Sequence, residues 1–383
     1  MNLPEDIEIN IIARLPMQSM ARFKSVCRGW KSFTESKFFR DLYASNSSPT
    51  SCSNWSILRR DDLSTHSGLE EVKLDLPRQS RHGTTSFASF FTEIKGMYNK
   101  LDTHKVLACT DGLVLLRHND LPLRYYIGNP VLRQWIQLPA VNNDYTYNEL
   151  GLVTRMHNHT LLCYKVVLIE KEWSGSRTYR FLIFSSDTGE WSAKQVLSCP
   201  CPSTPNPVSL NGKLHWFDPT GRIIVHDFFS NDDQVRAISL PTKMQGSTRS
   251  SGQLVCTTSQ GSFVLIDVGV MEDVTKSYNV RIWRLKCDSW SWEKAWDINL
   301  ASLGLGRNCV PMAINCFDID IIYLWDYYSK CFLACNLRTN TKSYGARKEV
   351  YPFKDTLCLE TWPRLSQFVP SLQVVPTLKP KLI

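Results

Sequence analysis

The segment Gly128-Asn129-Pro130-Val131-Leu132-Arg133-Gln134-Trp135 is the clearest copy of a pattern that recurs along the chain. In each copy a strand leads into a polar turn, and an aromatic or apolar strand leads out. Ser186-Asp187-Thr188-Gly189-Glu190-Trp191 is a second copy, and weaker ones follow at 227–235, 286–290 and 336–344. The anchors lie 56, 44, 55 and 54 positions apart; they are Trp135, Trp191, Val235, Trp290 and Tyr344. A period of roughly 50 residues is typical of four-stranded propeller blades.

Short strand candidates surround this repeat from about Trp55 to Leu337. Asp111-Gly112, Thr188-Gly189 and Asn211-Gly212 are turn signals between them. Long amphipathic helices, which a parallel α/β fold would need, are absent from the pattern. Five blades are legible, and the segment Trp55 to Leu76, closed by a late strand at Ser371–Val375, predicts a sixth. A β-sandwich or an irregular multi-sheet domain is the alternative.

The first forty residues follow a helical pattern instead. Leu3-Pro4-Glu5-Asp6 is a helix start, because proline suits the first turn and the helix dipole favours the acidic residues there. One helical face follows, and Pro16 ends it; its residues are Ile7, Ile11, Ile12 and Leu15. A second and a third apolar set predict two more short helices; they are Met20, Phe23, Val26 or Cys27, and Trp30, then Phe33, Phe38, Phe39, Leu42 and Tyr43.

This helical module carries more apolar surface than a three-helix core can hide. Ile9, Leu15, Pro16 and the Met17–Met20 region are in excess. Since a module of about forty residues is marginal alone, the excess predicts a contact surface. The residues leave two readings open: a partner protein binds there, or the helices form a cap on the chain's own large domain.

Composition narrows the classes of function that remain possible. The net charge is +8 without a run of five or six basic residues, so neither direct nucleic-acid binding nor a membrane is expected. The first residues lack a signal-peptide pattern, and apolar runs such as Leu161–Ile169 are too short to span a bilayer. A nuclear or cytoplasmic location is therefore expected. There the 13 cysteines should be mostly reduced and packed as small apolar groups.

The sequence contains no recognisable catalytic constellation. Structural zinc needs four ligands in paired spacings, which Cys199 with Cys201, Cys309 with Cys316, and Cys331 with Cys335 do not supply. His157 and His159 alternate without a third ligand. No nucleophile elbow is present, and Gly304-Leu305-Gly306 lacks the third glycine of a dinucleotide fingerprint. We expect no cofactor, no metal and no enzymatic activity. A propeller enzyme, the rival, would need convergent histidine, tyrosine, cysteine or carboxylate groups at the mouth of the domain.

The N-terminal pattern resembles the F-box motif in its plant form. The resemblance rests on Leu3-Pro4-Glu5-Asp6-Ile7, Ile11 to Pro16, Arg22 to Trp30, and Phe38. It departs from the family at Asn10, Met17-Gln18 and Met20. The resemblance implies docking on a Skp-type adaptor, which bridges to cullin and RING subunits. It also implies the adaptor contacts, which are Leu3, Pro4, Ile7, Ile11, Leu15, Pro16, Phe23, Val26, Cys27 and Trp30.

The later chain resembles plant F-box-associated domains. The stretches that carry this resemblance are Cys109–Leu116, Gly128–Trp135 with Leu138-Pro139, Val208–Trp216 and Arg281–Leu285. These stretches are structural, so they indicate the domain and leave its target protein unknown.

Together these observations predict an α+β multidomain protein. A three-helix F-box at 1–44 and a Ser-rich linker at 45–54 precede an all-β, propeller-like domain of about six blades at 55–378. The function expected is that of a non-catalytic substrate-recognition subunit of a Skp–cullin–F-box ubiquitin ligase, which acts by proximity. The alternative is an F-box scaffold or glycan-binding module that acts outside ubiquitination.

Overall fold

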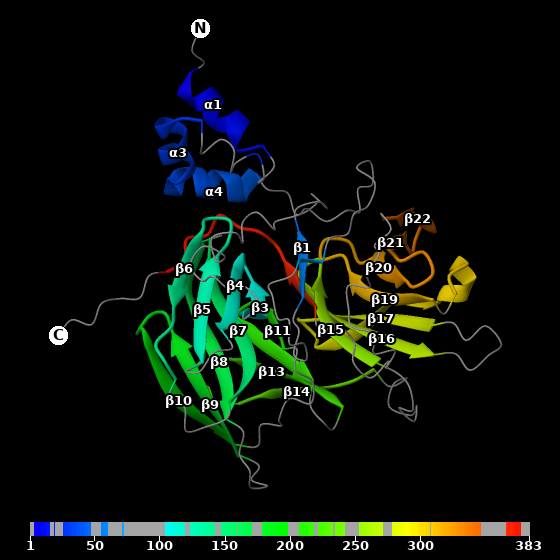
Figure 1. The fold of residues 1–383 in the computed structure, drawn as a ribbon. Helices are drawn as coiled ribbons and strands as arrows, with labels where there is room; N and C mark the ends of the chain where they lie inside the picture. Colours follow the sequence, from blue (N-terminus) through cyan, green and yellow to red (C-terminus); the bar gives the residue numbers. More distant parts are fainter. Residues whose placement is uncertain are drawn as a thin grey trace.

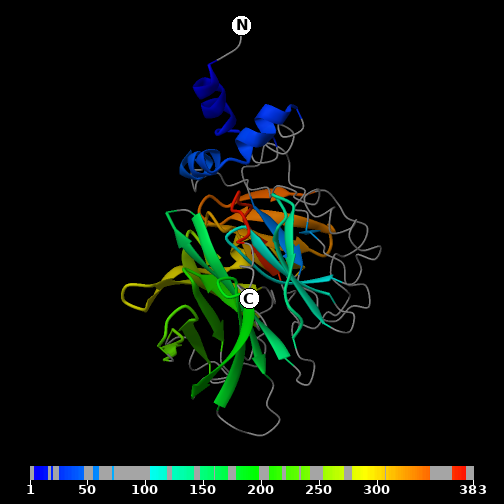
Figure 2. The ribbon, with the colours of Figure 1, turned by 90° about the vertical axis from the view of Figure 1, so that its left-hand side faces the viewer.

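The chain forms a small helical module on a large β domain (Figures 1 and 2). The computed structural model describes residues 4–15, 19, 26–46, 55–59, 71–72, 104–118, 123–141, 147–158, 160–170, 178–197, 207–217, 221–232, 234–241, 253–270, 278–306, 308–345 and 365–376. The described helices of the module are α1 (Glu5–Ile12), α3 (Arg28–Thr34) and α4 (Lys37–Asn46). Beyond Asn46, the predicted linker lies outside the described residues.

The β domain is built from antiparallel sheets arranged around a centre, as a propeller is. Five of the described sheets have four strands each. Blade 1 comprises β3 (His104–Thr110), β4 (Leu113–His118), β5 (Arg124–Asn129) and β6 (Gln134–Gln137). Blade 2 comprises β7 (Tyr147–His157), β8 (Thr160–Glu170), β9 (Thr178–Ser185) and β10 (Glu190–Leu197). Blade 3 comprises β11 (Val208–Leu210), β12 (Lys213–Phe217), β13 (Arg222–Asp227) and β14 (Arg236–Ser239).

Two further four-stranded blades complete this set. Blade 4 comprises β15 (Gln253–Ser259), β16 (Ser262–Val270), β17 (Tyr278–Lys286) and β18 (Ser291–Asn299), and a 3-10 turn, η3 (Leu300–Leu303), follows it. Blade 5 comprises β19 (Cys309–Ile314), β20 (Ile321–Asp326), β21 (Cys331–Asn336) and β22 (Thr341–Tyr344). The innermost strands β3, β7, β11 and β15 lie side by side at the centre. The propeller prediction is confirmed and the sandwich alternative is excluded.

A three-stranded sheet closes the ring. β1 (Ser56–Arg59) lies between β2 (Glu71–Val72) and β23 (Leu365–Phe368), and its register with β23 runs from Ser56 opposite Phe368 to Arg59 opposite Leu365. Strands from the two ends of the β domain therefore share one sheet. This sheet occupies the sixth position, so the described residues hold five complete blades where about six were predicted.

The closing strand is not the one that the sequence predicted. Ser371–Val375 lies beyond β23 and joins no sheet. Its backbone groups are bound by side chains instead: Asn129 Nδ2 donates to the carbonyl oxygens of Ser371 and Gln373, and Val375 N donates to Gln134 Oε1. Pro370 and Pro376, which lack an N–H, flank the segment and disfavour a ladder there.

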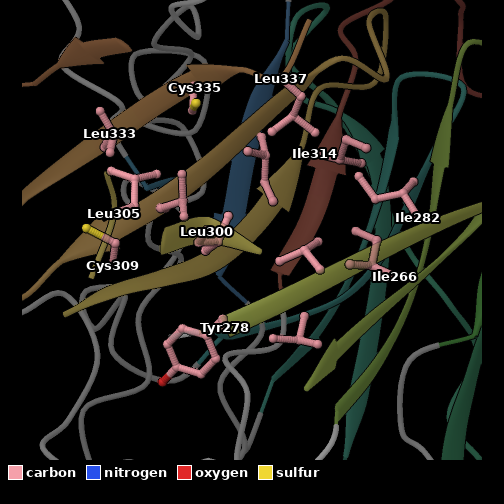
Figure 3. Packing of buried hydrophobic residues seen from close by; sticks show 14 of the residues in the cluster. Ile266, Tyr278, Ile282, Leu300, Leu305, Cys309, Ile314, Leu333, Cys335 and Leu337 are labelled. Atoms are coloured by element: carbon pink, nitrogen blue, oxygen red, sulfur yellow. The ribbon is translucent and has the colours of Figure 1, made fainter. Parts of the chain in front are cut away.

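Apolar side chains from adjacent blades fill the space between them. Between blades 4 and 5, Ile266 and Ile282 pack with Leu333, Cys335 and Leu300 (Figure 3). Burying each aliphatic side chain is worth about 1.5–3 kcal/mol, so these inter-blade layers hold the ring together.

The helical module packs on blade 1 and on the C-terminal segment. Phe39 is fully buried and meets Phe33 edge-to-face, with ring centroids 4.9 Å apart. Ile12, Ala13, Phe39 and Tyr43 share one buried cluster with Leu372, and Val131 and Leu132 pack against it. One side of the module therefore covers the chain's own β domain, as the cap alternative in the sequence analysis predicts.

Candidate functional site

Among its described residues, the helical module exposes four large apolar side chains. Their exposed fractions are 48% for Ile7, 50% for Ile11, 64% for Val26 and 64% for Phe38. Ile7 and Ile11 are one helical turn apart on α1, so they share a face, whereas the adjacent Ile12 is buried against the β domain. We call these four residues the exposed apolar set. Apolar side chains concentrated on so small a module mark a contact surface.

The structure separates the predicted adaptor contacts into groups. Pro4, Ile7, Ile11, Val26 and Cys27 are exposed. Leu15 and Trp30 are half-buried. The remaining three predicted contacts lie outside the described residues; they are Leu3, Pro16 and Phe23.

Three of these residues also have internal roles. Cys27 is the N-cap of α3, and its Sγ accepts a hydrogen bond from Trp30 N at 3.4 Å. The Trp30 side chain packs against the cluster that joins the module to the β domain. The carbonyl oxygen of Leu15 accepts a hydrogen bond from Tyr43 Oη at 3.3 Å. Substitutions of Cys27 and Trp30 would therefore disturb the module itself, whereas the contact of Leu15 is made by its backbone.

Phe38 is a candidate contact that the predicted set omitted, although it belongs to the third apolar pattern. It is 64% exposed, while its neighbour Phe39 is fully buried. Two consecutive residues of a helix point in directions about 100° apart, so a short helix that buries Phe39 turns Phe38 outward. The adjacent residues Phe38 and Phe39 were therefore the sequence signal that one of the two rings faces outward.

A second candidate surface is the central channel of the propeller. The channel holds a cavity of about 1050 Å³ lined by the inner strands of several blades. Its lining mixes hydroxyl, amide, apolar and charged groups; it includes Asp111, Thr154, Arg155, Asn211, Phe229 and Gln260. Met156 and Val369 add apolar surface, with 38% and 37% of their side chains exposed. A cavity of this size lies at the upper end of the range of ligand-binding clefts.

Many of the polar groups that line the channel are already engaged. Thr154 Oγ1 donates to the carboxylate of Asp111, and Asp227 Oδ1 accepts from Phe229 N at 2.8 Å. The Arg155 guanidinium lies 4.4 Å from the centre of the Phe229 ring and donates to the Phe229 carbonyl oxygen at 3.4 Å. These contacts make the lining rigid.

A lysine also holds the Phe229 turn. Lys165 Nζ donates to the carbonyl oxygen of Phe228 at 2.8 Å and lies 5.0 Å from the Phe229 ring centre. Burial lowers the pKa of Lys165, and the nearby Arg155 and Lys194 lower it further. Blades 2 and 3 are thus joined at the channel by two cations on one aromatic ring, which is worth about 0.5–2 kcal/mol for each cation.

The cysteines and histidines give no sign of metal or nucleophilic chemistry in the part of the chain that the structure describes. No group of three or more histidine, cysteine, aspartate or glutamate side chains there could hold a metal ion. Cys309, Cys316, Cys331 and Cys335 are buried. Burial raises the pKa of the Cys309 thiol to about 12, so it stays protonated near neutral pH.

His157 is exposed at the end of β7, whereas His159, Cys199 and Cys201 lie outside the described residues. The described helices include none long and apolar enough to cross a membrane.

Comparison with known proteins finds a matching family for each of the two parts of the chain. A family model described as F-box domain matches residues 1–42. A second, described as F-box protein At3g26010-like, beta-propeller, matches residues 53–363. Putative F-box protein At3g23950 of Arabidopsis thaliana is 32% identical over 91% of this chain and 86% of its own length. F-box protein At3g26010 of the same plant is 33% identical over 92% of this chain and 82% of its own length. A solved chain of a nidogen/laminin complex is 10% identical with a TM-score of 0.38, over 83% of this chain and 99% of that one, a likeness too slight to carry an argument.

Proposed function

Because the chain belongs to the F-box proteins with an At3g26010-like β-propeller, we propose that it is the substrate-recognition subunit of a Skp–cullin–F-box ubiquitin ligase. The F-box docks on a Skp-type adaptor, and the propeller holds a target protein. The protein performs no bond chemistry of its own. It raises the local concentration of the target near the charged conjugating enzyme that the cullin and RING subunits bring.

The observation that carries this proposal is the exposed apolar set on the F-box helices. Ile7, Ile11, Val26 and Phe38 are about half exposed or more, whereas Ile12, Phe39 and Tyr43 are buried where the module packs on the propeller. Covering each apolar side chain with a partner recovers part of the roughly 1.5–3 kcal/mol that full burial gives. An adaptor that binds here leaves the channel free for a target.

The target side of the proposal rests on the channel. Its lining is held rigid by Asp111, Thr154, Lys165 and Arg155, and a rigid surface costs less to order when a partner binds. We place the target segment over the channel mouth, near Phe229 and Met156. Three loops of the β domain, at 142–147, 171–177 and 243–252, are further candidates for target contact. They lie outside the described residues except for Tyr147, the first residue of β7.

The proposed location is the nucleus, the cytoplasm, or both, where the ligase subunits act. No cofactor is needed in this mechanism. The alternative role, a scaffold or glycan-binding module outside ubiquitination, shares the same adaptor surface and differs in whether a cullin joins the complex.

The experiment measures binding of the full-length chain to a purified Skp-type adaptor by isothermal titration calorimetry. The test variant carries Ile7→Asp with Ile11→Asp. Both residues are about half exposed, so we expect the variant to fold and to keep the thermal transition of the wild type. Burying two unpaired carboxylates in an apolar interface costs several kcal/mol, which corresponds to a loss of affinity of at least about a hundredfold. The matched control is Tyr328→Asp, an 84% exposed residue on blade 5.

Three outcomes decide the proposal. Binding by the wild type and by the Tyr328 variant, with loss in the double variant, supports it. A wild type that fails to bind any Skp-type adaptor overturns it, as does a double variant that binds with unchanged affinity. Complexes isolated from plant cells then separate the two roles, because a ligase subunit carries cullin and a scaffold does not.

A further inference from the structure

Two separate segments of the propeller hold the F-box module. One is the turn between β5 and β6, where Val131 and Leu132 pack against the module. The other is the segment after β23, residues 369–376, which we call the C-terminal strap. Leu372 of the strap is only 5% exposed and belongs to the same buried cluster as Ile12 and Phe39 of the module. The orientation of the F-box therefore depends on how these two segments are held together.

One buried side chain holds both segments. Asn129, the last residue of β5, is fully buried. Its Nδ2 donates to the carbonyl oxygens of Ser371 and Gln373, at 2.8 and 2.7 Å. Its Oδ1 accepts from the backbone N–H groups of Val131 and Leu132, at 2.9 and 3.4 Å. All four hydrogen-bonding positions of the amide are used, two on the turn and two on the strap.

We propose that Asn129 is a positioning residue that fixes the orientation of the F-box on the propeller by tying the C-terminal strap to the turn of blade 1. This inference needs no adaptor and holds whether or not the chain acts in a ligase. If the chain does act in a ligase, the position of the bound adaptor relative to the propeller depends on these hydrogen bonds of Asn129.

Other blades show that an acceptor alone suffices for the turn. Asp227 ends β13 and accepts from Phe229 N and Ser230 N, and Asn336 ends β21 and accepts from Arg338 N and Thr339 N. An aspartate can thus form this turn in the same fold. The part specific to blade 1 is the pair of donors on Nδ2, and an aspartate at position 129 would lack them.

The C-terminal strap contacts blades 1 and 2 at several points along its length. Gly112 permits its close approach, because a Cβ there would lie 2.3 Å from Ser371 Cβ. Farther along, Gln373 Oε1 accepts from Leu161 N of blade 2 at 2.9 Å, and the buried Val375 packs in the core between blades 1 and 2. The strap is thus fixed to blades 1 and 2 on one side and contacts the F-box through Leu372 on the other.

The test compares Asn129→Asp with Asn336→Asp in the full-length chain. Donor and acceptor dyes are attached through unnatural amino acids at the exposed positions of Lys31 on α3 and Tyr328 on blade 5. Single-molecule energy transfer then reports the F-box-to-propeller distance. We expect one narrow peak for the wild type and for the Asn336 variant. We expect Asn129→Asp to lose that peak and give a broad distribution, because its carboxylate faces two carbonyl oxygens and releases the strap.

A second variant keeps the proposal testable if Asn129→Asp fails to fold. Leu372→Ala leaves the hydrogen bonds of Asn129 in place and removes only the contact with the F-box, so it should broaden the distribution in the same direction. Adaptor affinity should be unchanged in both variants, since Ile7 and Ile11 are untouched; this separates a failure here from a failure of the proposed function. A narrow peak at the wild-type distance in folded Asn129→Asp overturns the proposal. If that variant does not fold, a narrow peak in Leu372→Ala overturns it equally.

Discussion

Trp191 Nε1 donates a hydrogen bond to the carbonyl oxygen of Pro139 at 2.9 Å, and this bond joins blade 2 to blade 1. The indole also meets Tyr125 of blade 1 and Phe184 of its own blade, with ring centroids 6.2 and 5.4 Å away. Blade 4 repeats the arrangement, because Trp292 Nε1 donates to the Ser239 carbonyl oxygen of blade 3 at 2.8 Å. In blades 2 and 4 the tryptophan of the outer strand therefore links its blade to the preceding one.

Replacing Trp191 with phenylalanine should weaken the joint between blades 1 and 2. An aromatic ring remains, but the variant loses the Nε1 donor and part of the contact area of the indole, so we expect a loss of about 1–3 kcal/mol in the free energy of unfolding. Chemical denaturation with fluorescence detection measures it. Tyr328→Phe is the control, because Tyr328 is 84% exposed and the change should stay within about 0.5 kcal/mol. A Trp191→Phe variant as stable as the control would show that the bond contributes nothing.

Neighbouring isoleucines on α1 should respond in opposite ways. Ile12 is 4% exposed and packs on the propeller, so Ile12→Ala should destabilise the F-box module by about 2–4 kcal/mol. Ile11 is 50% exposed, so Ile11→Ala should leave stability within about 0.5 kcal/mol and weaken adaptor binding. Hydrogen exchange of α1 and α4 measures the first effect and calorimetric titration the second. Equal exchange rates in the two variants would contradict the assigned faces.

Two turn glycines should differ in how much they tolerate a methyl group. Gly112 and Gly261 have φ of +78° and +68°, so alanine costs about 1–2 kcal/mol at either position. At Gly112 the new Cβ also meets Ser371 Cβ at 2.3 Å and Ser371 N at 2.9 Å, whereas at Gly261 no atom lies within 4 Å. We expect Gly112→Ala to cost a further 1–3 kcal/mol or so from overpacking. Thermal denaturation of the pair checks the difference, and equal melting temperatures would refute the close approach of the strap.

Buried His215 should make the propeller less stable in mild acid. His215 is 2% exposed and stacks on Phe263, with ring centroids 5.0 Å apart, and burial lowers its pKa from 6.5 to about 4. Above pH 6.5 the ring is neutral in both folded and unfolded chains. As the pH falls from 6.5 to 4 the unfolded chain takes up the proton first, so stability declines by about 3 kcal/mol over that interval.

The His215→Phe variant isolates this effect. Its free energy of unfolding, measured by denaturant titration at several pH values, should lack that part of the decline. Parallel pH profiles for the wild type and the variant would show that His215 is not the group responsible.

The outer strands are harder to delimit from the sequence than the inner ones. β6, β10, β18 and β22 are the outermost strands of their blades, and their described residues are largely half-buried or exposed. They lack the apolar runs that mark an inner strand, so the repeat places only an anchor residue in or beside each of them, and their bounds follow from backbone pairing with the neighbouring strand. In β7 the apolar pattern is interrupted by Gly151 and charged residues. Asp320 is half-buried, and its carboxylate accepts from Trp296 Nε1 and Arg338 Nε, contacts that no local pattern in the sequence indicates.

The sequence shows the repeat but does not fix the exact position of the anchor residue in each copy. Trp135 and Trp191 are each the second residue of an outer strand, and the equivalent residue of blade 4 is Trp292. The anchor predicted there, Trp290, lies in the preceding turn with φ of +51°. Two tryptophans two positions apart are equivalent in sequence, and only the turn geometry distinguishes them.

By itself the sequence determined the helical F-box, the propeller and the approximate repeat of its blades, because local apolar periodicity and turn chemistry act over a few residues. Tertiary structure alone decided which of the neighbouring residues Ile11, Ile12, Phe38 and Phe39 face outward. It also decided that the ring closes at Leu365–Phe368 and that Asn129 binds a strap more than 240 positions away in the chain. Contacts at such separation follow from how the blades pack, and no short stretch of sequence encodes them.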